Sequence, residues 1–324
     1  MRKVIKKGTN KLKITTDKNE LKPGKNEVLI QVKAAGVNPE DIFASLPRFA
    51  PAKHTETVPG LEISGDITAV GQDVDQNLVD QAVIALVPGG GYCEQAVVST
   101  DYIFPMPRKL DYADAAALLV NYITAYQLVV QNARPAPEET VLIHDVDSAY
   151  GCAIADLLKK SGCKLIGSAP VKKHYALEDF DLDLLIDYNA PDWTKQIKDF
   201  TGTQGVDIIF DPLNSKFNRL NYNLLSSGGR IGFYGYHNQS LFSGKFSRKK
   251  LLQDNKAVFG VDLTWLARDT GQLKKITNTL FSMIEKNSIS PLVYKTFSLF
   301  QVKLAWNTII KKQNTGKAVL EISV

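Results

Sequence analysis

Short apolar runs that alternate with helical segments constrain the fold of this chain more than any other feature. The runs are Thr140–His144, Lys164–Gly167, Val206–Phe210 and Gly229–Tyr234, and the segment Cys152–Lys159 between the first two is helical in composition. A strand that is apolar along its length has to be covered on both faces, and strands separated by helices pair in parallel. The pattern therefore predicts an α/β fold with a doubly wound parallel sheet, the architecture of dinucleotide-binding domains.

The segments on either side of this region predict a second, β-rich domain. Residues 28–33 follow the period of two of a strand with one wetter face, and apolar runs punctuated by glycine follow at 63–70, 82–87 and 92–98. Beyond about residue 259 the sequence indicates a long helix, a strand, a short helix and a final strand. We assign residues 1–120 and 261–324 to the β-rich domain and residues 121–260 to the dinucleotide-binding domain.

Composition excludes several classes of protein. The chain has 324 residues, 44% of them hydrophobic and 23% charged, which is ordinary for a globular protein with two cores. The net charge of +5 is mild, and we interpret the short basic run Arg248–Lys250 as a solvated face. The sequence shows no transmembrane run and no signal peptide, and its three cysteines are typical of reduced thiols. We expect a cytoplasmic protein with no nucleic-acid partner and no membrane span.

Several motifs resemble the quinone oxidoreductase branch of the medium-chain dehydrogenase/reductase superfamily. They are Gly36–Asp41, Pro59–Glu62, Val120–Tyr126, Asp187–Tyr188 and Gly316–Leu320. Val120–Tyr126 and Gly205–Leu213 are most similar to the VAT-1 group, and Phe259–Leu263 resembles the enoyl reductase domains of polyketide synthases. The resemblance covers nearly the whole chain and implies a Rossmann domain inserted into a GroES-like domain.

The same resemblance indicates that the chain binds no zinc. The zinc alcohol dehydrogenases of this superfamily have a Cys where Asn38 stands and a His where Leu61 stands. An amide and an aliphatic side chain supply neither the thiolate nor the imidazole that such a site needs. A structural zinc lobe would require four closely spaced cysteines, and the four histidines show no paired spacing. We therefore expect no metal.

The loop after the first apolar strand departs from the family pattern. Where the pattern is Ala-x-x-Gly-Gly-Val-Gly, residues 145–151 read Asp-Val-Asp-Ser-Ala-Tyr-Gly, and only Gly151 remains, which serves helix–strand packing. Side chains at Ser148 and Ala149 occupy space that phosphates would use, and each aspartate opposes an anion by roughly 1 kcal/mol or more. Asp147 or Ser148 can instead cap the helix, and the Ser148 hydroxyl can donate a hydrogen bond to a phosphate. The alternative is a capped helix that binds no dinucleotide tightly.

The end of the second apolar strand favours NADPH over NADH. An NAD-selective site carries Asp or Glu there, whereas this chain has Ser168 followed by Lys172 and Lys173. The resemblance implies that Ser168, Lys173 and Tyr188 hold the 2′-phosphate and adenosine; alternatively, the lysines only cap the strand–helix junction. The resemblance also implies cofactor contacts elsewhere in the chain, from Asn38, Thr124, Ser148, Gly151, Tyr234, Val261 and Lys317.

The chemistry implied by the resemblance is metal-free hydride transfer from NADPH to the β-carbon of a quinone or α,β-unsaturated carbonyl. Asn38 is a candidate hydrogen-bond donor beside the nicotinamide or the substrate carbonyl, or it serves only the tight turn before the next proline. Phe43 stands where related quinone reductases often have Tyr, so the proton would come from water or from Tyr122. Four aromatic residues either line an apolar slot or belong to the cores: Phe43, Tyr122, Tyr234 and Trp265.

Two functions of different classes are compatible with this sequence. The first is a zinc-independent, NADPH-dependent reductase of a small apolar quinone or enone. The second is a non-catalytic relative that keeps the fold as an interaction or scaffold module after losing its phosphate loop. We also predict a homodimer, because members of this branch commonly pair through the last strand of the nucleotide domain, which we place at Ile231–Tyr236.

Overall fold

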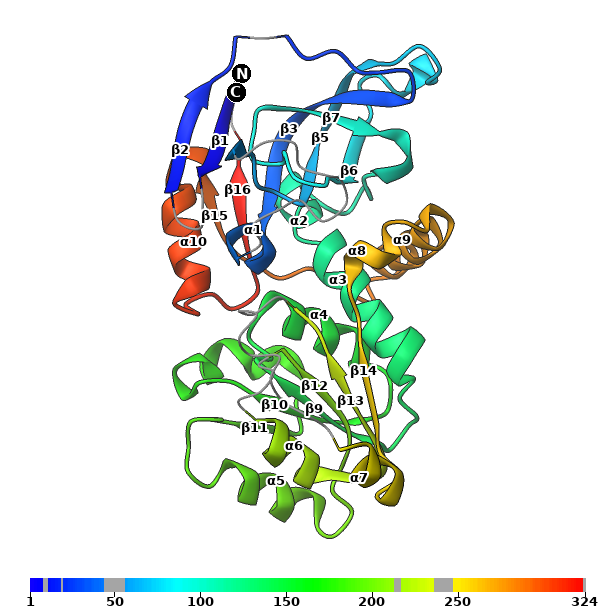
Figure 1. Cartoon of the computed structure of the whole chain (residues 1–324), viewed down its shortest axis with the longest axis vertical. Coiled ribbons are helices and arrows are strands. Elements are labelled where there is room, and N and C mark those ends of the chain that lie inside the picture. Colours follow the sequence, from blue (N-terminus) through cyan, green and yellow to red (C-terminus); the bar gives the residue numbers. More distant parts are fainter. Residues whose placement is uncertain (8–10, 19, 44–55, 213–216, 236–246, 323–324) are drawn as a thin grey trace. The chain divides into compact units, whose positions relative to one another are not determined.

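The computed structural model of the chain describes residues 1–7, 11–18, 20–43, 56–212, 217–235 and 247–322 (Figure 1). It contains two compact units. Unit 1 comprises Met1–Ile123 and Leu263–Val324, and unit 2 comprises Thr124–Asp262. The predicted fold class, a doubly wound sheet together with a β-rich domain, is confirmed.

Unit 2 is built on one six-stranded parallel sheet. Its strands are β9 (Thr140–His144), β10 (Lys164–Ser168), β11 (Leu184–Ile186), β12 (Val206–Asp211), β13 (Leu225–Phe233) and β14 (Ala257–Gly260). The order across the sheet is β11-β10-β9-β12-β13-β14, and every neighbouring pair is parallel. Counted within the unit this is 3-2-1-4-5-6, the order of dinucleotide-binding sheets, which bind ligands at the carboxyl ends of the strands where the order reverses. That place lies between β9 and β12.

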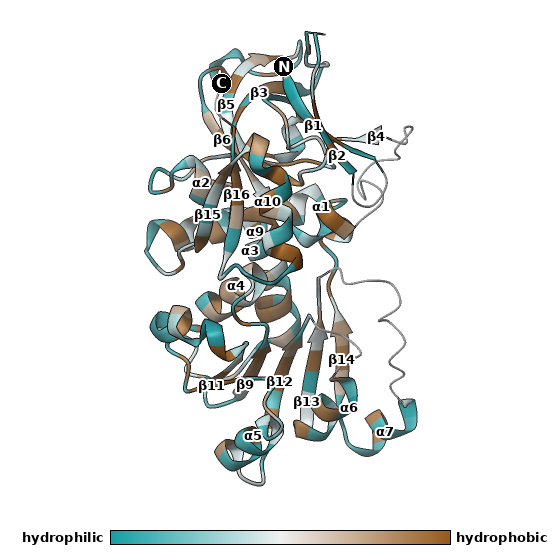
Figure 2. Cartoon of the chain, turned by 90° about the vertical axis from the view of Figure 1, so that its left-hand side faces the viewer, coloured by the Kyte–Doolittle hydropathy of each residue, from teal (hydrophilic) through white to brown (hydrophobic). Residues whose placement is uncertain are grey.

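Helices cover this sheet, and its strands are apolar as expected. The helices are α4 (Ala149–Leu158), α5 (Trp193–Thr201), α6 (Asn218–Leu224) and α7 (Arg248–Gln253), with a π-helical turn at Gln127–Ala133 and a 3-10 segment at Val171–Phe180. Figure 2 shows long hydrophobic stretches along the strands. Leu142, Ile166 and Ile209 are fully buried at the centre of the core. A strand buried on both faces cannot alternate, which explains the continuous apolar runs.

The edge of the sheet corrects one prediction. The segment 231–236 was expected to form the last strand, but Ile231 lies in β13, between β12 and β14, and is opposite Val258 of β14. Residues 236–246 lie outside the described part of the chain. Among the described residues, the outermost strand is therefore β14, and any edge-to-edge pairing would use Ala257–Gly260.

Unit 1 contains two sheets. Its strands are β1 (Arg2–Lys7), β2 (Lys11–Thr16), β3 (Glu27–Val37), β4 (Glu56–Thr57), β5 (Glu62–Val70), β6 (Ala82–Leu86), β7 (Gln95–Ser99), β8 (Ile103–Pro105), β15 (Val293–Ser298) and β16 (Lys317–Glu321). One sheet has the order β2-β1-β4, and the other has the order β15-β16-β3-β5-β6-β8, with β7 also paired to β3. The antiparallel pairing of β16 with β3 places Ala318 opposite Val37. Residues from both ends of the chain therefore meet in this unit.

The helices of unit 1 are short except for one. They are α1 (Pro39–Phe43), α2 (Tyr112–Ala115), α3 (Leu119–Tyr126), α8 (Leu263–Leu266), α9 (Thr270–Glu285) and α10 (Val302–Ile310), with 3-10 turns at Gln76–Leu78, Thr100–Tyr102 and Leu299–Gln301. Asp269 caps α9 by accepting a hydrogen bond from the backbone N–H of Gln272 at 3.0 Å. The core of the unit packs β3, β5 and β16 against α10 through residues such as Val32, Ile63 and Leu320.

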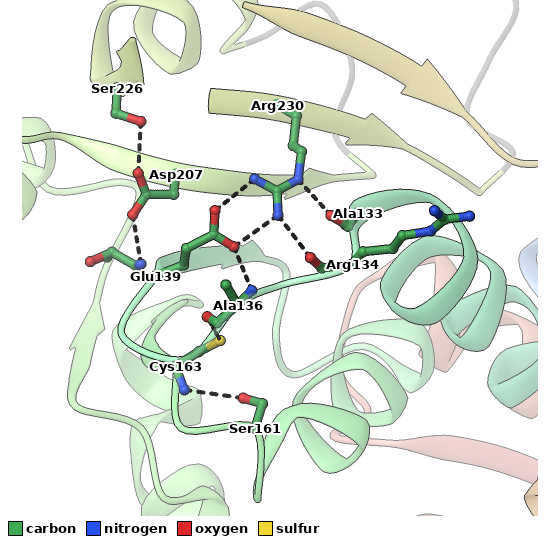
Figure 3. A network of polar contacts seen from close by, with 10 residues as sticks. Ala133, Arg134, Ala136, Glu139, Ser161, Cys163, Asp207, Ser226 and Arg230 are labelled. Carbon is green, nitrogen blue, oxygen red and sulfur yellow. Dashed lines mark hydrogen bonds and ion pairs between the residues drawn. The ribbon is translucent and has the colours of Figure 1, made fainter. Parts of the chain in front are cut away.

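A polar network ties the amino ends of the strands in unit 2 together (Figure 3). Arg230 donates hydrogen bonds to both carboxylate oxygens of Glu139, at 2.9 and 2.8 Å. Asp207 accepts from the backbone N–H of Thr140 at 2.9 Å and from the hydroxyl of Ser226 at 2.8 Å. These bonds join β9, β12 and β13 at the end of the sheet opposite to the carboxyl ends of its strands. The network therefore contributes to the stability of the fold.

Replacing Glu139 by Gln is expected to lower stability only where the carboxylate is charged. The hydrogen bonds and positive charge of Arg230 lower the pKa of Glu139 from its ordinary 4.5. Because the folded-state pKa is depressed, the stabilisation is fully present above about pH 4.5 and disappears as the pH falls through the folded-state pKa. Both side chains are mostly buried, at 19% and 25% exposed, so the loss at neutral pH should be about 1–2 kcal/mol.

Urea denaturation at a series of pH values measures this difference between wild type and Glu139→Gln. The exposed Glu178, changed to Gln in the same way, is the matched control and should alter stability by less than about 0.5 kcal/mol at any pH. A difference between wild type and Glu139→Gln that stays constant down to about pH 3 would contradict the assignment.

Candidate functional site

Three residues at the carboxyl ends of neighbouring strands of unit 2 form a buried hydrogen-bond chain. His144 ends β9, Ser168 ends β10 and Asp211 ends β12. The Nδ1 atom of His144 lies 2.7 Å from the Ser168 hydroxyl, and its Nε2 atom lies 2.9 Å from Oδ1 of Asn221. Asn221 in turn donates from Nδ2 to Asp211 at 2.9 Å. All four side chains are fully buried.

The hydrogen bonds of this buried group determine which atom donates and which accepts at each contact. Asn221 presents its amide oxygen to His144 because its NH2 group faces the Asp211 carboxylate, so Nε2 of His144 must donate. In a neutral ring Nδ1 then accepts, and the Ser168 hydroxyl donates to it. Ser168, predicted to bind the 2′-phosphate of NADPH, is thus hydrogen-bonded to His144 within the core. Its phosphate-binding role stays a prediction.

Aromatic rings enclose this polar chain. The ring of Phe217 stacks on His144 with centroids 5.4 Å apart, and Trp193 meets His144 edge-on at 5.7 Å. Tyr188 packs against Phe217 with centroids 5.9 Å apart. These rings surround the polar chain within the core, which accounts for its complete burial.

The loop that follows β9 is shaped as a helix cap. Asp145 has a φ of 49°, in the left-handed region, and the Ser148 hydroxyl accepts a hydrogen bond from the backbone N–H of Gly151 at 3.0 Å. A Cβ atom on Gly151 would lie 2.3 Å from the carbonyl oxygen of Asp145, so only glycine fits there. This close approach is the helix–strand packing role that the sequence indicated for Gly151.

The two aspartates of the loop interact with residues that we predicted to bind the cofactor. Asp145 and Asp147 are each only 5% exposed. Burial raises the pKa of Tyr188, and the charge of Asp145 and a hydrogen bond to its side chain raise it further. Burial lowers the pKa of Lys173, and the charge of Asp147 opposes that shift. The cationic and hydroxyl groups expected to bind NADPH therefore already face carboxylates of the chain itself.

Three further predicted cofactor contacts lie in unit 2. Tyr234 is buried; its ring packs edge-on against Tyr150 at 5.7 Å, and its hydroxyl donates to the His144 carbonyl at 3.5 Å. Thr124 is also buried. Val261 is half-buried, and its N–H donates to the carbonyl of Phe233 at 3.2 Å, which extends the pairing of β14 with β13. Of these, Tyr234 lies beside the loop.

A second buried polar cluster lies in unit 1, around Lys317. The ammonium group of Lys317 donates to Oδ1 of Asn38 at 2.5 Å, to Oε1 of Glu62 at 2.6 Å and to Oδ1 of Asn121 at 2.6 Å. The Nδ2 group of Asn38 donates to Glu62 at 3.1 Å. Both amide atoms of Asn38 therefore serve the cluster, which supports its structural role over that of a hydrogen-bond donor to substrate. Lys317, predicted to contact the cofactor, is itself only 2% exposed and paired with a carboxylate.

The aromatic residues considered for an apolar slot have different surroundings. Tyr122 is buried and its hydroxyl donates to the carbonyl of Ser290 at 3.0 Å, so its proton is engaged in a structural bond. Tyr234 belongs to the core of unit 2, whereas Phe43 and Trp265 are exposed. The structure does not gather the four rings into one pocket wall within either unit.

Sequence reasoning did not single out three of the residues that shape these clusters. His144 was treated as an ordinary strand residue, and Glu62 and Asn121 were noted only as parts of motifs. A polar residue inside an otherwise apolar motif was the available signal, because buried polar side chains need partners.

Within the described ranges, no group of three or more His, Cys, Asp or Glu residues is arranged to hold a metal ion. No helix in the described part of the chain is both long and apolar enough to cross a bilayer.

Comparison with known proteins gives matches in both units. Residues 24–108 match the alcohol dehydrogenase GroES-like domain, and residues 149–275 match the zinc-binding dehydrogenase family. The synaptic vesicle membrane protein VAT-1 homolog of Danio rerio is 30% identical over 96% of this chain, which spans only 66% of that relative's length. The quinone oxidoreductase of Rattus norvegicus is 26% identical over 97% of this chain and 94% of its own length.

Solved structures share the fold over the whole chain. The human VAT-1 homolog-like protein has a TM-score of 0.87 and 26% identity, with 100% of this chain and 98% of the other covered. A mycobacterial protein complexed with NADPH has a TM-score of 0.88 and 20% identity, with 99% of each chain covered.

A parallel sheet of order 3-2-1-4-5-6 inserted into a GroES-like unit defines the class of medium-chain dehydrogenases/reductases. The chain belongs to this superfamily and is of the zinc-free, quinone oxidoreductase-like type.

Proposed function

We propose that the chain is a zinc-independent oxidoreductase that uses NADPH to reduce a small apolar quinone or α,β-unsaturated carbonyl. The observation that supports this most directly is the order of the parallel sheet, whose reversal between β9 and β12 is where this class of fold holds a dinucleotide. Membership of an oxidoreductase superfamily supports the same reaction type. The NADPH complex of the mycobacterial structure supports the choice of cofactor.

The residues at the carboxyl ends of β9 and β10 include groups that suit a dinucleotide and groups that oppose it. The amino end of α4 and Gly151 suit a pyrophosphate, because helix N-termini attract anions. Lys173 would hold the 2′-phosphate if its ammonium group interacted with the phosphate in place of the Asp147 carboxylate. Asp145 and Asp147 repel the phosphates from within the same loop. We therefore expect NADPH to bind, with an affinity well below that of a glycine-rich loop.

Bound NADPH would supply the hydride, and the protein supplies position and a dry environment. Gly151 lets α4 pack closely on the loop after β9, and the N-terminus of α4 would orient the pyrophosphate. The hydroxyl of Tyr122 donates its one proton to the carbonyl of Ser290, and Asn38 uses its oxygen for Lys317 and one amide N–H for Glu62. The proton that completes the reduction would therefore come from water.

Titration of the purified protein with NADPH, followed by cofactor fluorescence, tests the proposal together with oxidation of NADPH in the presence of a quinone or enone. We expect saturable binding and substrate-dependent oxidation. Absence of binding at millimolar NADPH would contradict the proposal.

Replacing Lys173 by Ala should narrow the preference for NADPH over NADH, mainly by weakening NADPH. One charge-assisted bond to phosphate is worth about 1.5–3 kcal/mol, or roughly ten- to a hundredfold in affinity. The neighbouring Lys172 is exposed and carries the same charge, so Lys172→Ala is the matched control and should leave the ratio unchanged. Equal wild-type affinities for the two cofactors, or an unchanged ratio in Lys173→Ala, would count against Lys173 as the discriminator.

A second candidate function is a non-catalytic interaction module, and one observation favours it. Asp145 forms a hydrogen bond with Tyr188 and the charge of Asp147 acts on Lys173, so residues predicted to bind the cofactor interact with the loop itself. A protein that binds no dinucleotide and keeps its stability and fold would fit this candidate. The NADPH titration therefore separates the two.

The protein is expected to be a homodimer that pairs through the edge of the six-stranded sheet. The pairing would use β14, because an unpaired parallel edge is stabilised by a two-fold partner. Replacing the half-buried Val258 of β14 by Pro removes a backbone N–H from this edge and should give a monomer. Light scattering at micromolar concentration measures the mass, and a monomeric wild type would contradict the prediction.

A further inference from the structure

The ammonium group of Lys317 fixes the orientation of two amides in unit 1. An ammonium has three N–H donors, and those of Lys317 go to the oxygens of Asn38, Glu62 and Asn121. All four side chains are at most 2% exposed. Because an ammonium cannot accept a hydrogen bond, each amide must turn its oxygen to Lys317 and its NH2 group away. A flipped amide would place two donors against each other.

The NH2 groups of the two amides differ in what they meet. That of Asn38 donates to Oε1 of Glu62 at 3.1 Å. That of Asn121 is buried and has no hydrogen-bond partner among the described residues. Leaving a buried donor without a partner is unfavourable, so such groups usually meet a water or a ligand. Flipping the amide cannot remove this cost, because Oδ1 is held by Lys317.

The position of this donor is rigid. Asn121 lies in α3, and the preceding residue, Val120, donates its backbone N–H to Oε2 of Glu62 at 2.9 Å. The same carboxylate thus holds both the backbone of the helix and the ammonium that orients the amide. Accepting a bond from a cation also polarises the amide, which makes its N–H groups stronger donors. A rigid, polarised donor is suited to an oxygen that gains negative charge during a reaction.

We infer that the Nδ2 group of Asn121 is the hydrogen-bond donor for the carbonyl oxygen of the substrate, with Lys317 and Glu62 as positioning residues. The inference rests on the proposed function. Hydride addition to the β-carbon of an enone moves the carbon–carbon π pair toward the carbonyl oxygen, NADPH becomes NADP⁺, and a proton from water then completes the saturated ketone. Asn121 stabilises the oxygen while it carries this charge. It takes the role that the sequence suggested for Asn38.

The variant Asn121→Asp tests this assignment, because it keeps an oxygen for Lys317 and replaces the NH2 group by a second oxygen. We expect kcat/KM for an enone to fall about a hundredfold, with NADPH affinity changed less than threefold. Asn77 is exposed in the same unit, and Asn77→Asp is the isosteric control that should leave activity unchanged.

A spectroscopic readout separates a direct contact from a structural effect. The carbonyl stretch of benzylideneacetone bound with NADP⁺, which cannot reduce it, should shift to lower wavenumber in the wild type and not in Asn121→Asp. Asn121→Ala also lacks the donor and provides the same test if the aspartate variant does not fold. Wild-type turnover with an unshifted band, or a variant that keeps both shift and rate, overturns the inference and leaves the proposed function standing. A wild type that neither binds nor reduces any enone overturns both.

Discussion

The triple variant Asp147→Ala/Ser148→Gly/Ala149→Gly is expected to bind NADPH about tenfold to a hundredfold more tightly than the wild type. It removes one buried carboxylate and two Cβ-bearing side chains from the loop at the amino end of α4. Loss of the charge and of the steric obstruction together should contribute about 1–3 kcal/mol to binding.

The same variant is expected to be less stable. The Ser148 hydroxyl that accepts from the N–H of Gly151 is lost, and two glycines make the unfolded chain more flexible. Together these changes should lower the free energy of unfolding by about 1–2 kcal/mol. Binding and stability thus move in opposite directions, which a general folding defect cannot produce.

Ser247→Gly is the matched control for the loss of the cap. Ser247 caps α7 in the same unit by accepting from the N–H of Lys250, far along the chain from the loop. This variant should lose stability and leave NADPH affinity unchanged. Tighter NADPH binding with new or faster enone reduction in the triple variant would mean that the catalytic groups are intact behind a weak cofactor site. No binding in either the wild type or the triple variant would favour the scaffold function instead.

The sheet was predictable because its physical cause is local. Strands such as Thr140–His144 and Val206–Asp211 have a continuous apolar middle, since both faces are covered, and the intervening helices favour parallel pairing. The edge was not predictable in the same way. The strand β14 is only four residues long and is half-buried or exposed, so its apolar run is too short to distinguish a strand from a loop. The segment Phe259–Leu263 was therefore interpreted only as a motif that resembles enoyl reductase domains, and no strand was predicted there.

The candidate site was predictable only in part, because its contacts join distant positions. The two loop aspartates were seen to oppose a phosphate, but their interactions with Lys173 and Tyr188 depend on how separate strands end. The residue types at 168 and 317 suit phosphate binding. Their side chains are nevertheless used by His144 and Glu62, which no spacing in the sequence pairs with them.

Replacing Lys317 by Met should destabilise the protein more than any other single change considered for unit 1. The variant leaves the fully buried carboxylate of Glu62 without its cation and removes the donor from the oxygens of Asn38 and Asn121. Breaking a buried ion pair by removing one partner typically costs about 3–5 kcal/mol, because an uncompensated charge stays in the core. The Glu62 carboxylate is also tightly packed, so it has little room to move away from its buried position. A Cβ on Gly36 would lie 2.5 Å from the Glu62 carboxylate.

Neutralising the partner should restore much of the loss. The double variant Lys317→Met/Glu62→Gln removes both charges, and Gln keeps an amide that can still meet Asn38 and the N–H of Val120. We expect the double variant to be more stable than Lys317→Met, with a coupling energy of about 2–3 kcal/mol in a double-mutant cycle measured by urea denaturation. Lys274→Met is the control, since that lysine forms an exposed pair with Asp101 in the same unit and should cost less than about 1 kcal/mol.

This cycle also decides between the two roles considered for Lys317. A structural cation gives a large loss of stability that Glu62→Gln relieves, while NADPH affinity in the folded variants changes little. A cofactor-binding cation gives the reverse, with weak NADPH binding in Lys317→Met that Glu62→Gln cannot repair and with stability close to that of the Lys274→Met control. The burial of Lys317 and its three oxygen partners favour the first outcome. In that case the positive charge acts on the reaction through Asn121, whose amide it orients, and not through a phosphate.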